Sequence, residues 1–205
     1  MLKKEFQFEK TFDELENGKF GKYDNIKYFG IKALSSEEQR NQVSVLYYDS
    51  SDNFAIKLET KQEDEVILCK NPEGKTFNEI YKNIEEKESN FKGNKNIEEK
   101  EIVKIPNIKL NEKAEFSEIE NKPFYLSNGN SYLIEKAIQT IQFELDKTGG
   151  KIKSEAGMMV SKTATLLPEE LREFVIDDTF AIFLKENGKD KPYFAGKISD
   201  ITKFQ

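Results

Sequence analysis

The run from Tyr132 to Gly157 constrains the fold of this chain more than any other stretch of its sequence. Apolar residues in it alternate with polar ones, the period-2 pattern of a strand with one buried face. The apolar members are Ile141, Phe143 and Leu145. Two adjacent glycines follow, and they allow a tight turn because glycine adopts backbone angles that other residues avoid. The pattern predicts an extended segment over residues 132–146, followed by a turn.

The residues after this turn have the pattern of a second, short strand. Read with period 2, one face carries small and mostly apolar residues, and the other face carries only charged ones. The first face consists of Gly150, Ile152, Ser154 and Ala156. A segment of this kind neither demands burial nor forbids it, so it can be a loop in one state and a strand in another.

The composition is sufficient for one substantial domain, and we expect residues 1–205 to form it. A length of 205 residues can bury a sizeable core. Charged residues are frequent at 34%, but 16 Phe and 8 Tyr supply large apolar side chains.

Several function classes are disfavoured by what the sequence lacks. It contains no His, and Cys69 is its single cysteine, so His-based catalysis, an intrachain disulfide and a multi-cysteine zinc site are excluded. No phosphate-loop motif is present. We therefore expect neither an enzyme nor a bound cofactor or metal. Cys69 follows an apolar run, which favours a thiol packed in the core.

Charge and hydropathy bear on partners and location. The net charge is −6 with both signs interleaved, which argues against nucleic acid and against an anionic membrane as partners. The first residues lack the apolar core of a signal peptide, and no apolar run is long enough to span a bilayer. The sequence as given predicts a cytoplasmic protein, although a chain that had already lost a signal segment would read the same.

Further strands and one clear helix are predicted along the chain. The pattern of apolar residues favours a short strand within residues 5–12, longer ones over residues 28–34, 42–48 and 54–58, and one over 102–110 with a bulge at Pro106. The continuous apolar run of residues 66–69 favours another strand. We expect 54–58 and 66–69 to form a hairpin in which the second strand is buried on both faces. A helix is expected from Thr76, because Thr76-Phe-Asn-Glu79 has the form of a capping box and apolar residues recur at helical spacing after it.

Three segments resemble motifs of the serpin family. Residues 134–149 resemble the strand and hinge that precede the serpin reactive-centre loop, with Phe143-Glu-Leu-Asp146 in place of I-E-V-N and Gly149 at the hinge glycine. Phe174–Leu184 is similar to the family's F-x-A-D-H-P-F-L-F-F-I, and Tyr193–Ile198 is similar to its terminal strand I-L-F-x-G-R-V.

The resemblance implies the C-terminal half of a serpin-like fold. That fold would be α+β and mainly β, with antiparallel and mixed sheets and one or two short helices. The three matched segments would lie in neighbouring strands. Residues 117–131 are shorter than the helix and connection that serpins have there, and the N-terminal part of the family pattern, with most of its central sheet, has no counterpart in the sequence.

The resemblance also implies a site. Residues 150–173 would be an exposed loop of the reactive-centre kind, with Gly149, Gly150, Ile152, Ser154 and Ala156 as its hinge. Counting from Gly149 places the bait bond near Lys162, Thr163 and Ala164. Lys162 would suit a trypsin-like protease, and the next two residues an elastase-like or subtilisin-like one. The alternative is an ordinary connection between two strands.

Two functions remain open on this interpretation. In the first, the loop engages a serine or cysteine protease or another partner without full covalent trapping, since a loop cannot insert between two strands when one is absent. In the second, the protein is a non-inhibitory assembly module that completes its sheets with a second chain or with a copy of itself.

Overall fold

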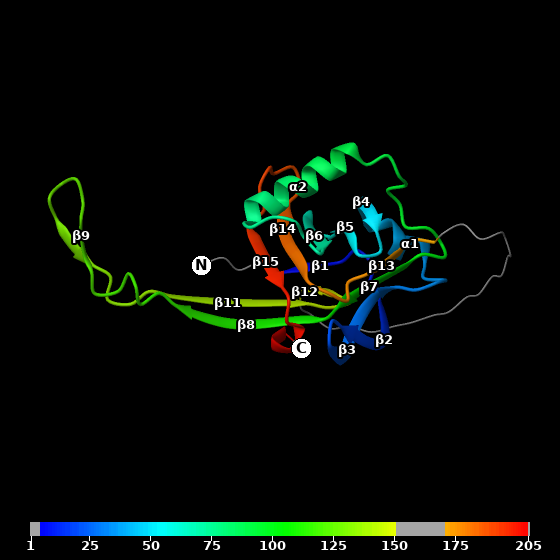
Figure 1. Cartoon of the computed structure of the whole chain (residues 1–205), viewed down its shortest axis with the longest axis horizontal. Helices are drawn as coiled ribbons and strands as arrows, with labels where there is room; N and C mark the ends of the chain where they lie inside the picture. The colour runs from blue at the N-terminus through cyan, green and yellow to red at the C-terminus, as the bar shows by residue number, and fades with distance from the viewer. Residues whose placement is uncertain (1–4, 151–170, 205) are drawn as a thin grey trace.

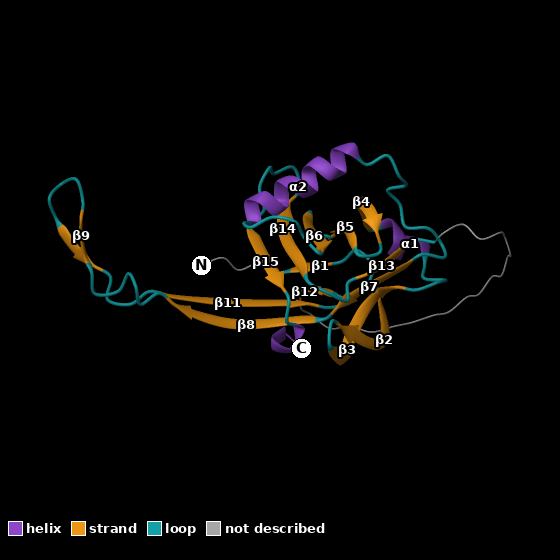
Figure 2. Cartoon of the chain, viewed as in Figure 1, coloured by secondary structure: helices purple, strands orange, loops and turns teal. Residues whose placement is uncertain are grey.

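The computed structural model describes residues 5–150 and 171–204, and these residues form a mainly β structure with two α-helices (Figures 1 and 2). A body of two packed sheets carries a long two-stranded arm that extends away from it (Figure 1). The expected fold class, mainly β with antiparallel and mixed sheets and a few helices, is confirmed. Neither helix within the described residues has the length and apolar composition needed to cross a bilayer.

The larger sheet of the body has five antiparallel strands in the order β15-β14-β6-β5-β4. Their bounds are β4 (Val43–Ser50), β5 (Asn53–Glu59), β6 (Asp64–Lys70), β14 (Phe180–Glu186) and β15 (Phe194–Ile198). The predicted hairpin is β5–β6, and β6 lies at the centre of the sheet. Val66 and Leu68 point into one core cluster and Ile67 and Cys69 into another, so β6 is buried on both faces as its apolar run indicated.

Helix α2 (Phe77–Asn90) covers one face of this sheet (Figure 1). Its predicted capping box is present, because the Thr76 side chain accepts from the backbone of Glu79 and the Glu79 side chain accepts from the backbone of Thr76. Ile80, Tyr81 and Ile84 are buried against the sheet. The short helix α1 (Glu37–Asn41) precedes β4 and was not anticipated.

The opposite face of the large sheet packs on a four-stranded mixed sheet in the order β13-β7-β3-β2. Its strands are β2 (Asp13–Phe20), β3 (Tyr23–Ile31), β7 (Ile102–Pro106) and β13 (Glu173–Val175), and β13 runs parallel to β7. The core between the sheets is rich in phenylalanine, for example Phe54 and Phe174 with ring centroids 5.3 Å apart.

The expectation of one bulged strand over residues 102–110 is wrong. Pro106 ends β7, and β8 (Ile108–Glu115) begins a different sheet after Asn107, whose backbone N–H donates to Lys27 at 2.9 Å. A proline cannot donate to a strand ladder, so it marks here the place where the chain leaves one sheet for another.

The arm consists of β8 paired antiparallel with β11 (Ile138–Leu145). At its far end lies a small hairpin of β9 (Pro123–Tyr125) and β10 (Ser131–Leu133), which we call the tip (Figure 1). Three short elements complete the description: β1 (Phe6–Gln7), β12 (Gly149–Gly150) and the 3-10 helix η1 (Ile201–Phe204).

The structure confirms one expectation for the three segments that resemble serpin motifs and corrects another. The segment expected to be extended over residues 132–146 is only partly so: β11 (Ile138–Leu145) is confirmed, but residues 134–137 are not in a strand and residues 132–133 belong to the tip. The last two matched segments are neighbours, since β14 pairs with β15. The expectation that the first matched segment lies beside these two strands is wrong, because β11 pairs with β8 instead. β11 contacts β15 through side chains on one of its faces, where the rings of Phe143 and Phe194 stack with centroids 5.1 Å apart.

Candidate functional site

The chain reverses direction immediately after β11. Asp146 and Gly149 exchange both backbone hydrogen bonds, each 3.2 Å long, and the Asp146 carboxylate accepts from the backbone and the hydroxyl of Thr148. The reversal leads into β12, which pairs antiparallel with β1 through Phe6 opposite Gly150 and Gln7 opposite Gly149. In Figure 1, β12 and β1 lie on the side of β11 that faces away from β8. The predicted hinge glycines are therefore held in a short three-strand contact.

Gly149 occupies a position that no other residue fits without strain. Its φ is +117°, and a Cβ built there would lie 2.5 Å from the carbonyl oxygen of Phe6 and 2.6 Å from the Cα of Gln7. Both obstacles are backbone atoms, which cannot rotate away. The resemblance that placed a hinge glycine at 149 thus has a steric reason in this chain.

The other predicted site residues lie in the part of segment 150–173 that the structure does not describe. Ile152, Ser154 and Ala156 of the hinge, and Lys162, Thr163 and Ala164 of the bait bond, lie outside the described residues. Their roles stay predictions.

The far end of segment 150–173 is anchored by Arg172. Its guanidinium donates from Nε and Nη2 to the two carboxylate oxygens of Glu101, at 2.6 and 2.9 Å, and to the carbonyl oxygens of Asn94 and Asn96. Glu101 is 3% exposed. The guanidinium also lies over the ring of Phe174, 5.2 Å from its centroid. Both ends of the segment are thus tied to the body.

The Arg172 anchor was missed by the sequence analysis, although a signal was present. Arg40 and Arg172 are the two arginines among 32 basic residues. A chain that uses lysine almost throughout keeps arginine where a planar, multidentate donor is needed, and Arg172 is such a place.

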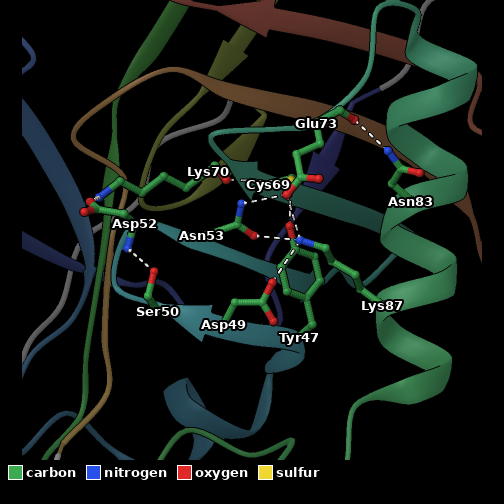
Figure 3. Close-up of polar contacts among 10 residues, drawn as sticks. All are labelled: Tyr47, Asp49, Ser50, Asp52, Asn53, Cys69, Lys70, Glu73, Asn83 and Lys87. Atoms are coloured by element: carbon green, nitrogen blue, oxygen red, sulfur yellow. Dashed lines mark hydrogen bonds and ion pairs between the residues drawn. The ribbon is translucent and has the colours of Figure 1, made fainter.

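Cys69 lies at the buried end of a polar cluster under α2 (Figure 3). Its Sγ is 3.3 Å from the Tyr47 hydroxyl, and the ring of Tyr47 lies under the ammonium of Lys87, 4.7 Å from its centroid. Lys87 in turn binds Asp49 and Glu73, and these bonds raise its pKa although burial opposes the shift. Burial raises the pKa of the Cys69 thiol to about 11. The predicted packed core thiol is confirmed, and it is not activated as a nucleophile.

The described residues do not bring three or more potential metal ligands together. Their most unusual feature is instead the arm. Within the described residues β8 and β11 form a sheet of their own, so each presents one outer edge without a ladder partner. Such an edge is a template for another strand.

The two edges of the arm differ in composition. β8 carries four charged residues, Lys109, Glu112, Lys113 and Glu115, which is the usual protection of an edge strand. β11 carries none from Ile138 to Phe143, and that stretch contains no proline or glycine. Six residues of this kind are typical of segments that pair readily with another strand. The outer edge of β11 is therefore the less protected of the two.

No protein-family model matches this sequence, and a search among curated proteins finds no match. Solved structures do match, and the similar ones are serpins. Serpin48 of the insect Tenebrio molitor is 13% identical with a TM-score of 0.53, covering 94% of this chain and 52% of that one. The thermophilic serpin tengpin in its native state is 14% identical with a TM-score of 0.55, covering 97% and 53%.

Human thyroxine-binding globulin is similar too, with 11% identity, a TM-score of 0.56 and coverage of 94% of this chain and 52% of that one. Identities this low show a shared fold, so the chain has a partial serpin fold. It spans about half the length of the solved structures that it matches (52–53%).

Proposed function

We propose that this protein is a non-catalytic binding module that completes its partial serpin fold with a β-strand from another polypeptide chain. The observation that supports the proposal most directly is the outer edge of β11, which has no ladder partner within the described residues and no charge from Ile138 to Phe143. The incoming strand would add to this edge by backbone hydrogen bonds, the recognition mode known as β-augmentation.

The energetics favour such an addition. Each backbone hydrogen bond contributes a net ~0.5–1.5 kcal/mol, and half of the peptide groups of an eight-residue strand face a given edge. The Phe143–Phe194 stack holds the base of β11 on the body, so less ordering is needed when the partner arrives.

Covalent trapping of a protease is not part of this proposal. A cleaved loop gains the energy for trapping by entering between two strands of a large sheet, and β11 has β8 as its one long partner within the described residues.

A peptide-binding experiment tests strand addition. The probe is a labelled synthetic peptide with the sequence Ile138–Leu145, and the control peptide carries proline at every second position. We expect the first peptide to bind and to slow amide hydrogen exchange in β11 while leaving β4–β6 unchanged. Gln142→Lys, which adds a charge to the edge strand, should weaken binding at least tenfold. Exchange in β11 that is unaffected by saturating peptide would overturn the proposal.

A second candidate, engagement of a serine or cysteine protease by segment 150–173, is favoured by the anchoring of both its ends. Gly149 and Gly150 are held by β1, and Arg172 is held by Glu101, which is the arrangement that a bait loop requires. The fold itself does not decide, because it is shared by a protein described as a highly specific serpin and by thyroxine-binding globulin.

Incubation with trypsin-, elastase- and subtilisin-type proteases, followed by denaturing gels and intact-mass analysis, tests this candidate. We expect cleavage near Lys162, Thr163 or Ala164 without an SDS-stable adduct. An adduct would show that trapping does occur, and resistance to all three proteases with their activity unchanged would remove the loop from consideration.

A further inference from the structure

Exposed large apolar side chains are concentrated at the tip of the arm. Among the described residues nine large hydrophobic side chains are exposed, and five of them belong to the eleven residues Pro123–Leu133. They are Phe124 (42%), Tyr125 (72%), Leu126 (47%), Tyr132 (44%) and Leu133 (51%). Single exposed apolar residues are ordinary, but a contiguous group of them marks a binding surface.

The two faces of the tip hairpin have different roles. Phe124 lies opposite Tyr132 in the ladder, and their rings stack with centroids 5.9 Å apart, which holds the hairpin together. Tyr125 and Leu133 lie on the other face, because side chains alternate along a strand. These two are the most exposed of the five. This second face also carries Pro123 and Ser131, and no apolar layer formed by the described part of the chain covers it.

The body does not cover this face. The tip lies at the end of the arm that is remote from both body sheets (Figure 1). An isolated two-stranded hairpin is at best marginally stable in water, so an uncovered apolar face at such a place is best explained by a partner outside the chain.

The charge pattern indicates which partner. Residues 123–134 contain no charged side chain, in a chain whose charged fraction is 34%. Next to them, Lys136 is paired with Glu115 and Glu120 at 3.2 and 3.7 Å. Within residues 123–134, which lie between Lys122 and Glu135, a strongly charged partner would find no counter-charge. Two copies of this chain, each with net charge −6, can meet at this place without bringing like charges together.

We propose that the tip binds the tip of a second copy of this chain, face to face about a two-fold axis, with Tyr125 and Leu133 of each copy packed against those of the other. This inference goes beyond the proposed strand addition, because it concerns a different surface of the arm and names the second chain as another copy. A two-fold contact is self-complementary by construction, and an uncharged aromatic face satisfies it.

The size of the surface indicates how tight the contact is. Eleven tip residues per copy are fewer than the ~20–30 residues per side of a standard interface. Tip contact alone should therefore give reversible, concentration-dependent dimers.

Sedimentation equilibrium and light scattering of the full chain test the contact. We expect the average mass of the wild type to rise towards that of a dimer with concentration. The double variant Tyr125→Ser/Leu133→Ser should have a dissociation constant at least tenfold higher. Both replaced side chains are exposed, so its thermal unfolding should match the wild type. Leu34→Ser, which removes a side chain that is 59% exposed on the body, is the matched control and should associate like the wild type.

A disulfide cross-link between the two copies tests the tip contact independently. Ser131→Cys places a thiol on the proposed contact face, while the buried Cys69 stays out of reach. Mild oxidation should convert this variant to a disulfide-linked dimer, whereas Ser51→Cys on the body should form no disulfide-linked dimer. A wild type that is monomeric at every concentration, or a double variant that associates as tightly as the wild type, would overturn the inference.

The peptide assay separates this inference from strand addition. If the wild type is monomeric but binds the Ile138–Leu145 peptide at β11, the tip contact fails and strand addition stands. If dimers depend on the tip but no peptide binds, strand addition fails and the tip contact stands. Co-sedimentation of a monomeric wild type with phosphatidylcholine vesicles, lost in the double variant, would assign the tip to a lipid surface and overturn the inference.

Discussion

Arg172 and Glu101 form an ion pair with two hydrogen bonds, in which the Glu101 side chain is 3% exposed and the Arg172 side chain 17%. The pair fastens the residue at the start of β13 to the segment that leads into β7, and these two strands lie parallel and adjacent. The return of the chain into the body after segment 150–173 therefore depends on it.

Replacing Arg172 by alanine should destabilise the fold by about 2–3 kcal/mol. The loss is large because a buried carboxylate loses its counter-charge. It lies below the ~3–5 kcal/mol of fully buried pairs because Arg172 retains some exposure and the backbone N–H of Glu98 still donates to Glu101. Urea unfolding followed by circular dichroism measures it. Lys10→Ala, which breaks the exposed pair with Glu38, is the control and should change stability much less, because solvent screens exposed pairs. Equal losses would contradict the role given to Arg172.

Gly149→Ala should cost about 2–4 kcal/mol, since it combines a positive φ with a collision against the backbone of β1. Gly188→Ala is the matched control: its φ is +74°, but no atom lies within 4 Å of the added carbon. That variant should lose about 1–2 kcal/mol from the backbone angle alone. If the two variants unfold at the same urea concentration, the close approach of β12 to β1 does not exist in solution.

Phe143→Ala should loosen the arm more than the body. The substitution removes the stack on Phe194 that holds β11 against β15, so amide exchange should accelerate in β8 and β11 and stay nearly constant in β4–β6. Gln142→Ala is the control: it removes an exposed side chain whose hydrogen bond to Asn111 of β8 is long, at 3.4 Å, so it should change exchange much less than Phe143→Ala does. Faster exchange spread evenly through both sheets would show that Phe143 supports the core rather than the arm.

Cys69 should be protected from thiol reagents in the folded protein and should make stability fall at high pH. Burial raises its pKa from 9.0 to about 11, so the folded state keeps a proton that the unfolded state loses. The stability that this proton confers is present below pH about 9 and is lost as the pH rises towards 11, at most about 2–3 kcal/mol.

Two measurements check the behaviour of Cys69. Its reaction with a disulfide reagent at pH 8 should follow global unfolding and become immediate in guanidinium. Between pH 9 and 10, the free energy of unfolding should fall more steeply for the wild type than for Cys69→Ala. A fast reaction of the native protein would mean that the cluster around Tyr47 opens readily.

The sequence predicted best where one local pattern decides the structure. The apolar run to Cys69 indicated a central strand, the Thr76–Glu79 pair indicated a helix start, and the alternation around Phe143 indicated a strand; all three are present. Each of these patterns depends on residues that are close in sequence, so the element that it predicts does not depend on contacts with distant parts of the chain.

What the sequence did not predict depends on distant partners. Alternation at β11 is the same whether its ladder neighbour is β8 or β14, because register and partner are set by contacts far along the chain. The anchoring of Arg172 by Glu101 joins residues 71 positions apart. The exposed tip could not be recognised either, since Phe124 and Tyr132 look like core residues until the length of the arm separates them from any core.

The backbone reversal between Asp146 and Gly149 has a consequence for any strand that joins β11. Gly149 and Gly150 lie next to the end of β11, so they would act as an end stop on the body side, while towards the tip β8 is the one described strand that pairs with β11. A strand of another chain that pairs with this edge would end where its terminus meets β12. The arm would then limit the length of the added strand and fix its register by steric exclusion, without contacts that depend on the side chains of that strand.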